Sequence, residues 1–235
     1  MKNQWHTIWN RRQPSKEALL GDWREVFLEL KRINGFDVME GGIPLASLLA
    51  QSARIKELLH LSAGQSVYDV GCGAGANLYL LAREGLAVGG TDYAAPLIEI
   101  AHKVLPDARE LTCTEADAFD IQIKYDAALS NSVFSYFPDE AFAARVLTRM
   151  LEKTTGAIGL IDVHDAEKEE AFLTYRRAAI KDYDERYKGL EKLFYQRAFF
   201  EDFARTHNMA VTFPEIPMEG YWNTPFVFNV FMYRK

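Results

Sequence analysis

The stretch VYDVGCGAGANL places Gly71, Gly73 and Gly75 within five residues, directly behind the carboxylate of Asp69. Glycines that follow a strand and open a helix let a ligand contact bare backbone, and the first turn of the helix presents free N–H groups. This arrangement is typical of nucleotide-type sites. The spacing Gly71-x-Gly73-x-x-Ala76 also satisfies the dinucleotide fingerprint, so the glycines alone do not separate the cofactor classes.

Asp69 narrows the choice of ligand. Strands that bind dinucleotides usually carry an apolar residue at this position, whereas a carboxylate two residues before the first glycine suits a ligand with a positively charged amino group. The sequence therefore favours a ligand with a positively charged amino group over one with a pyrophosphate.

The elements that position these residues form an alternating pattern. From Ser66 on, short apolar runs of strand length are separated by segments whose apolar residues recur at helical spacing, which is typical of repeated βα units and a parallel sheet. The predicted strands read SVYDVG, LAVGGTD, LTCTEA, YDAALS, GAIGLID, MAVTFPEI and FVFNVFMYRK.

Helical patterns flank this region on both sides. Apolar spacing predicts one helix from an N-cap at Ser15 to a stop at Asn34, and a second from Pro44 to His60. A charged helical stretch over residues 166–196 follows the fifth strand.

Composition limits the class of partner and compartment. A formal charge of −6 and the absence of a basic stripe in the sequence argue against a nucleic-acid partner. We expect no membrane segment, because the apolar runs are interrupted by charges and glycines. Two cysteines, Cys72 and Cys113, fit a cytoplasmic protein, and the five histidines lack the spacing of metal ligands.

Four motifs in register resemble those of class I S-adenosylmethionine-dependent methyltransferases. VYDVGCGAGANL resembles the first motif, GGTDY the second, EADAFD the third and YDAALSNSVFSYF the fourth, in the family's order and over residues 58–163. The resemblance implies an α/β fold, namely a Rossmann-like doubly wound seven-stranded sheet with an antiparallel last strand. The helical patterns described above add an N-terminal helical segment and a helical insertion after strand five to this fold.

The same resemblance implies S-adenosyl-L-methionine as the cofactor and assigns residues to it. Gly71, Gly73 and Gly75 would border the methionine part, and Asp69 would orient its amino group or the loop. Asp92 would hold the ribose hydroxyls; its alternative role is a cap of the next helix. The remaining predicted cofactor residues are Tyr93, Ser130, and, near the adenine, Asp117 with Ala118 or Phe119.

The acceptor should lie beyond the carboxyl ends of strands four and five, which end in SNSVFSY and IDVHD. These ends supply the predicted catalytic residues Asn131, Tyr136 and His164. A neutral His164 beside Asp162 and Asp165 is the predicted general base for a hydroxyl acceptor. The competing interpretation is that His164 caps a loop or bonds to a backbone carbonyl.

These observations favour a methyltransferase that acts on a small polar acceptor, with O-methylation of a sugar-like or secondary metabolite as the leading hypothesis. The alternatives are N- or C-methylation of a small metabolite, an NAD(P)-dependent reductase and a non-catalytic cofactor-binding subunit.

Residues 1–60 are predicted to form a helical cap, with Trp5 and Trp9 as a lid or an amphipathic helix, and residues 61–235 are predicted to form the methyltransferase domain. Aromatic tail segments of this kind cover the owner's site or a neighbour's, so a homodimer stays open.

Overall fold

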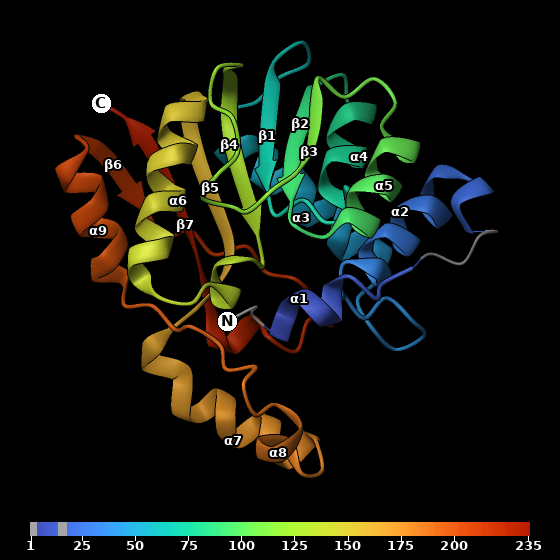
Figure 1. Cartoon of the computed structure of the whole chain (residues 1–235), viewed down its shortest axis with the longest axis vertical. Helices are drawn as coiled ribbons and strands as arrows, with labels where there is room; N and C mark the ends of the chain where they lie inside the picture. The colour runs from blue at the N-terminus through green and yellow to red at the C-terminus, as the bar shows by residue number, and fades with distance from the viewer. Residues whose placement is uncertain (1–3, 14–17) are drawn as a thin grey trace.

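The computed structural model of the chain describes residues 4–13 and 18–235. Seven strands form one sheet in the order β3-β2-β1-β4-β5-β7-β6 (Figure 1). Strands β1 to β5 pair in parallel, and β7 runs antiparallel to both β5 and β6, which confirms the predicted fold class. The strands are β1 Ser66–Val70, β2 Ala87–Asp92, β3 Glu110–Cys113, β4 Tyr125–Asn131, β5 Thr154–His164, β6 Met209–Thr212 and β7 Val227–Arg234.

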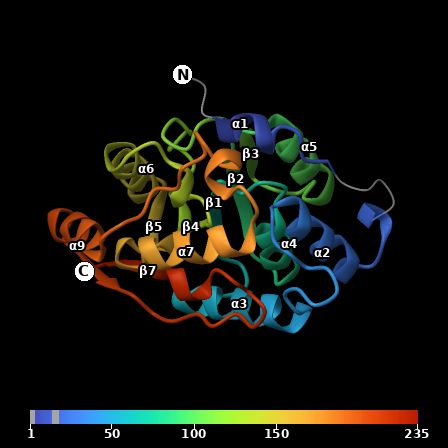
Figure 2. The ribbon, with the colours of Figure 1, turned by 90° about the horizontal axis from the view of Figure 1, so that it is seen from below.

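Helices cover both faces of the sheet (Figure 2). Successive strand residues point to opposite faces, so Val67 packs with α3 (Leu45–Leu58), α4 (Ala76–Arg83) and α5 (Ala95–Val104). Its neighbour Tyr68 packs on the other face with α6 (Glu140–Lys153) and α9 (Arg197–Thr206). The crossovers leave the carboxyl ends of the parallel strands at one edge of the molecule.

The N-terminal helical segment starts later than predicted. A 3₁₀ turn at Ala18–Leu20 precedes α2 (Trp23–Ile33), whose N-cap is Asp22, and the predicted N-cap Ser15 lies outside the described residues. The Asp22 carboxylate accepts from two backbone N–H groups of the first turn, and the Glu25 side chain accepts from the backbone of Asp22. This capping box fixes the helix start because it satisfies N–H groups that have no partner within the helix. Helix α1 (Gln4–Trp9) comes before this segment.

The insertion after β5 is only partly helical. Helix α7 (Glu169–Ala179) and the short α8 (Tyr183–Arg186) extend beyond the sheet at the bottom of Figure 1. The chain from residue 187 then runs back without regular structure and meets the end of β5 through a bridge between Asp165 and Tyr195. The helical expectation for residues 166–196 was therefore too long.

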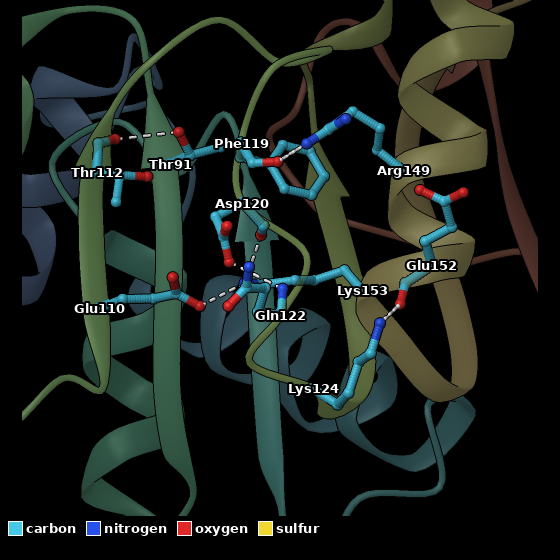
Figure 3. Close-up of polar contacts among 10 residues, drawn as sticks. All are labelled: Thr91, Glu110, Thr112, Phe119, Asp120, Gln122, Lys124, Arg149, Glu152 and Lys153. Carbon is cyan, nitrogen blue, oxygen red and sulfur yellow. Dashed lines mark hydrogen bonds and ion pairs between the residues drawn. The ribbon is translucent and has the colours of Figure 1, made fainter.

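No helix follows β3, and side chains hold that connection in place instead. Lys153 at the end of α6 is fully buried and pairs with Glu110 of β3 at 2.6 Å, while its ammonium donates to the backbone carbonyl of Asp120 at 2.7 Å (Figure 3). A buried lysine needs such partners because desolvation of an unpaired charge is costly. These contacts fix the loop that follows the third strand.

Candidate functional site

A cavity of about 600 Å³ lies at the carboxyl ends of β1, β2 and β4. Its walls come from the glycine turn after β1, the ends of β2 and β4, the loop after β3, and helices α1 and α2. Of the residues predicted from the sequence, it is lined by Gly71, Gly73, Asp92, Tyr93, Asn131 and Tyr136.

The glycine turn requires glycine for two separate reasons. Gly71 and Gly73 both adopt positive φ angles, +77° and +56°, which L side chains rarely adopt. A Cβ atom on Gly71 would lie 2.4 Å from a methyl group of Val133, and one on Gly73 would lie 2.4 Å from the Asn34 side-chain oxygen. Gly75 packs against α5 and does not line the cavity.

Asp92 links the glycine turn to the next helix. Its carboxylate accepts from the backbone N–H of Gly73 at 3.0 Å and from that of Ala94, at the start of α5, at 2.8 Å. Asp92 therefore does cap the next helix, as one of the two interpretations predicted. Because it also lies on the cavity wall, it is in a position to contact the ribose of a bound cofactor as well. Burial raises the pKa of Asp92 to about 6.

Helix α2 contributes polar groups that the sequence analysis did not select. The fully buried Lys31 lines the cavity, and its ammonium donates to Asn77 Oδ1 at 2.9 Å and lies over the ring of Phe36. Asn34, the C-cap of α2, accepts from the N–H of Ala74 at 2.8 Å and so joins the helix to the glycine turn. The sequence feature that could have identified these residues is the presence of a lysine and an asparagine among the apolar positions of the helix.

Asp69 lies behind the cavity wall rather than on it. Asn77 and Lys31 lie near it, yet no donor among the described residues reaches either carboxylate oxygen with hydrogen-bond geometry. Burial raises the pKa of Asp69 to about 7, whereas burial lowers that of Lys31 to about 8. A buried carboxylate and a buried ammonium therefore face each other with hydrogen-bonding capacity left over.

Helix α1 closes one side of the cavity. His6 stacks on Tyr93 with ring centroids 4.0 Å apart and lies 3.1 Å from the carboxylate of Glu115. Trp5 and Trp9 contact the ring of Tyr136 edge-on, at centroid distances of 4.7 and 5.7 Å. Figure 2 shows α1 beside α5, on the side of the molecule where the strands end.

The predicted adenine residues are displaced from the cavity. Asp117 pairs with Arg145 at 3.1 Å, and Phe119 is fully buried against Tyr68 with its carbonyl accepting from Arg149 (Figure 3). Neither these two nor Ala118 lines the cavity. The residues that do are Thr114, Glu115 and Ala116, just before them, and Phe142 of α6. The residues that line the cavity lie three positions earlier along the loop than expected, and the Phe119 ring packs against Tyr68 in the core instead.

Ser130 also differs from its expected role. Its hydroxyl is buried and donates to the backbone carbonyl of Val70 at 2.8 Å, which ties β4 to β1. The next residues, Asn131 and Ser132, line the cavity instead. Because side chains alternate along a strand, Ser130 and Asn131 point in opposite directions.

A buried polar network lies where β4 and β5 end. The Asp162 carboxylate accepts from the hydroxyls of Ser132 and Tyr221, each at 2.5 Å, and from the Asn223 side-chain amide at 2.9 Å. Burial raises the pKa of Asp162, while these three hydrogen bonds oppose the shift. Both Ser132 and Asp162 hold positive φ angles, +60° and +62°, a strained conformation for residues other than glycine.

Comparisons with known proteins agree with this geometry. A family model described as a methyltransferase domain matches residues 68–156. The chain therefore contains a methyltransferase domain, and its fold is that of class I S-adenosylmethionine-dependent methyltransferases. No curated protein matches the sequence.

Three solved structures show how far the fold likeness of this methyltransferase extends. The plantazolicin methyltransferase BpumL has 13% identity and a TM-score of 0.61, with 99% of this chain and 98% of that chain covered. Magnesium protoporphyrin IX methyltransferase from Synechocystis PCC 6803 has 14% identity and a TM-score of 0.57, with coverages of 98% and 97%. The amino pentose methyltransferase CalS10 from Micromonospora echinaspora has 14% identity and a TM-score of 0.59, with coverages of 78% and 88%.

The residues of the methyltransferase fit its cofactor. Asp92 on the wall has the chemistry to accept from ribose hydroxyls, and the pair of Lys31 and Asp69 matches the two opposite charges of an amino-acid group. Aromatic faces on the wall suit a sulfonium cation. They belong to Trp9, Phe36, Tyr93, Tyr136, Phe137 and Phe142.

His164 does not reach the cavity, which corrects its assignment as a base in contact with the acceptor. The ring packs against both Phe172 and Phe194, with Nε2 3.1 Å from the Asn223 amide nitrogen. Nδ1 has no hydrogen-bond partner among the described residues, so neither Asp162 nor Asp165 orients the ring directly. Burial lowers the pKa of His164 to about 3, which makes it a weak base at neutral pH.

Metal sites and membrane spans are both lacking from the part of the chain that the structure describes. Within residues 4–13 and 18–235, no group of histidine, cysteine or carboxylate side chains is arranged to hold a metal ion. Over the same ranges, no helix has both the length and the apolar composition needed to cross a membrane.

Proposed function

We propose that this methyltransferase transfers the methyl group of S-adenosylmethionine to a hydroxyl group of a small, polar, sugar-like acceptor. The observation that carries the proposal is the composition of the cavity wall. Charged and aromatic residues suited to the cofactor meet the polar side chains Asn131, Ser132 and Tyr136 at the end of β4. A cavity of about 600 Å³ falls within the usual range for small-molecule sites.

The cofactor end of the site is assigned as follows. Gly71 and Gly73 let the ligand approach the backbone, Asp92 accepts from the ribose, and Tyr93 with His6 encloses the adenosine part. Lys31 and Asn77 bind the carboxylate of the methionine part, and Asp69 attracts its amino group through the wall. When bound, the cofactor supplies a methyl group on a sulfonium that is already activated for displacement.

The protein has two tasks in the transfer itself. It must hold the acceptor oxygen in line with the methyl group, and it must accept the proton of the hydroxyl. Tyr136 is suited to positioning the acceptor because its ring is held in place. Trp5 and Trp9 contact the ring edge-on, and the Lys192 ammonium lies 3.2 Å from the ring centroid. Its predicted catalytic role is therefore proposed here as positioning.

Residues 1–60 are proposed to act as a cap that belongs to the same compact unit as the domain at 61–235. His6, Trp9, Lys31, Asn34 and Phe36 all line the cavity. The cap therefore completes the site rather than merely covering it.

One structural neighbour supports the sugar-like class, since CalS10 is an amino pentose methyltransferase. An amino sugar carries an amine beside its hydroxyl groups, so N-methylation is the nearest alternative. A reductase and a non-catalytic subunit are less well supported. The cavity wall combines charged groups suited to the methionine part of S-adenosylmethionine with polar side chains suited to an acceptor. We further propose that the enzyme is cytoplasmic, in keeping with its two free cysteines. Analytical ultracentrifugation would test whether it forms a homodimer.

The decisive experiment uses S-adenosyl-L-methionine labelled with ¹³C in the methyl group and a panel of small hydroxyl compounds and amines. Calorimetry with S-adenosylhomocysteine first tests cofactor binding. A methyl resonance in the O-methyl region of the product is expected, whereas an N-methyl resonance would replace the hydroxyl acceptor by an amine. Absence of binding to S-adenosylhomocysteine combined with binding of NAD would overturn the proposal.

A further inference from the structure

The polar network around Asp162 contains a path by which a proton can leave the cavity. Ser132 lies on the cavity wall, and its hydroxyl is 2.5 Å from Asp162 Oδ2. The same hydroxyl lies 3.0 Å from Asn131 Oδ1, but it has one hydrogen, which the closer and charged acceptor attracts more strongly. The lone pairs of the Ser132 oxygen are then available to accept from a ligand.

The three partners of Asp162 indicate that its carboxylate is ionised. Ser132, Tyr221 and Asn223 all act as donors, and a carboxylate that accepts three hydrogen bonds carries the negative charge. Lys192 from the chain after α8 is the basic group whose charge favours the ionised form of Asp162, while burial lowers the pKa of Lys192 itself. An ionised carboxylate with an elevated affinity for protons is suited to receive one.

His164 is connected to Asp162 indirectly, through Asn223. The Asn223 amide group has two hydrogens, of which one goes to Asp162, and the other faces Nε2 of His164 at 3.1 Å. Tyr221 and Asn223 come from the segment before η4 (Thr224–Phe226), far from β5 in the sequence. The C-terminal segment thus holds the carboxylate through side chains that do not line the cavity themselves.

We propose that Ser132 and Asp162 form the proton path of the reaction, with Ser132 in contact with the acceptor hydroxyl and Asp162 as the proton store behind it. This inference rests on the proposed function, because only a hydroxyl acceptor needs the path. An acceptor lone pair forms the new O–CH₃ bond, and the electrons of the S–CH₃ bond remain on sulfur. The acceptor proton passes to the Ser132 oxygen as the serine's own proton passes to Asp162.

The test compares two probes that differ in their need for a base. A set of hydroxyl compounds (catechol, methyl α-D-glucoside and myo-inositol) must lose a proton on methylation, whereas iodide attacks the same methyl group and has none to lose. S-adenosylhomocysteine formation is measured by mass spectrometry for both. Ser132→Ala and Asp162→Asn should lower hydroxyl turnover by roughly 10²- to 10⁴-fold and leave iodide turnover within about threefold, since proton removal is all they lack.

The chain offers a matched control pair. At the opposite end of β4, the Ser66 hydroxyl donates to Asp126 at 2.7 Å, remote from the cavity. Ser66→Ala and Asp126→Asn remove a serine and an aspartate of the same geometry and should leave the ratio of the two rates unchanged. Calorimetry with S-adenosylhomocysteine and thermal melting verify that each variant is folded.

A readout that needs no turnover is the ¹³C resonance of the Asp162 carboxyl group, identified by its loss in Asp162→Asn. In the wild type it should titrate above the ordinary range of aspartate, and Ser132→Ala should raise its pKa further by removing a donor to the charged form. Asp162 is hydrogen-bonded to Ser132, Tyr221 and Asn223, and the titratable groups whose charge interacts with it also include Lys192 and Tyr136. Protonation of Asp162 at low pH should slow hydroxyl transfer and spare iodide transfer.

Each outcome decides one question. Equal losses with both probes would make the two residues structural and overturn the path, as would full hydroxyl turnover in the two variants or an Asp162 titration that Ser132→Ala leaves unmoved. A wild type that methylates iodide but none of the hydroxyl compounds would overturn the path together with the hydroxyl acceptor. Failure of the wild type to bind S-adenosylhomocysteine would instead overturn the proposed function itself.

Discussion

At the scale of single residues, Asp92 combines a structural and a ligand-facing task. Its carboxylate holds the N–H groups of Gly73 and Ala94, and it lies on the cavity wall. Asp92→Ala should weaken S-adenosylhomocysteine binding by roughly tenfold to hundredfold, equivalent to the loss of ~1.5–3 kcal/mol of charge-assisted hydrogen bonds. Calorimetry measures the affinity, and an unchanged value would reduce Asp92 to a helix cap.

Lys31 permits a sharper residue test, because ligands with and without the amino-acid group can be compared. Lys31→Met should lower the affinity for S-adenosylhomocysteine by about tenfold to hundredfold. It should leave 5′-methylthioadenosine, which lacks that group, within about twofold, since no carboxylate is present for the ammonium to bind. Equal losses for the two ligands would contradict a carboxylate contact. Lys56→Met, at a surface ion pair with Glu84, is the matched control.

At the scale of elements, α1 is a short helix whose contacts are made with the site. It is tied down by the stack of His6 on Tyr93, the ion pair of His6 with Glu115 and the packing of Trp5 against Tyr136. Six residues cannot form a stable helix alone. The cavity wall therefore supplies what holds α1 in place.

Removal of α1 should accordingly affect ligand release more than stability. A variant that begins after residue 12 should release S-adenosylhomocysteine at least about tenfold faster, because the ligand loses one side of its enclosure. Its melting temperature should change by only a few degrees, since α1 buries a single tryptophan. Stopped-flow displacement gives the rate, Trp23→Ala on α2 serves as a control, and an unaltered rate would refute a lid.

At the scale of the whole molecule, the buried charges of the cofactor site affect stability as a function of pH. Burial raises the pKa of Asp69 to about 7 and of Asp92 to about 6, above their values in the unfolded chain. Between about pH 4 and 7 these two carboxyl groups therefore hold more protons in the folded state than in the unfolded state, so their contribution lowers the free energy of unfolding as pH rises. His164, whose pKa burial lowers to about 3, acts in the opposite direction, and because it is one group against two, the net change follows the carboxyl groups. The effect is the reverse of that for a carboxylate in an ion pair.

We expect urea unfolding of the ligand-free protein to show stability on the order of 1–3 kcal/mol higher at pH 5 than at pH 7. Asp69→Asn should flatten this dependence because it removes one of the two titrating groups, whereas Asp126→Asn at the other end of the sheet should not. Saturating S-adenosylhomocysteine should also flatten it, since its amino group would neutralise the carboxylate. A stability that rises from pH 5 to 7 would show that other groups dominate.

Local patterns in the sequence were sufficient to predict the sheet and the position of the site. Strand runs, helical periods and the glycine turn depend on neighbouring residues alone, and the carboxyl ends of parallel strands meet at one edge whatever the details. The motif resemblance singled out Gly71, Gly73, Asp92 and Tyr93, the strand ends singled out Asn131 and Tyr136, and all six line the cavity.

The packing of separate elements selects the other side chains that face the cavity. Lys31 reaches it because α2 packs beside the glycine turn, whereas Phe119 lies outside it because its ring packs against Tyr68 in the core. His164 follows the predicted strand, yet Asn223 and two phenylalanines enclose it, and the Ser132 hydroxyl meets Asp162 through contacts 30 residues apart in the chain. Such contacts join elements that are distant along the chain, and local periodicity carries no information about how those elements pack.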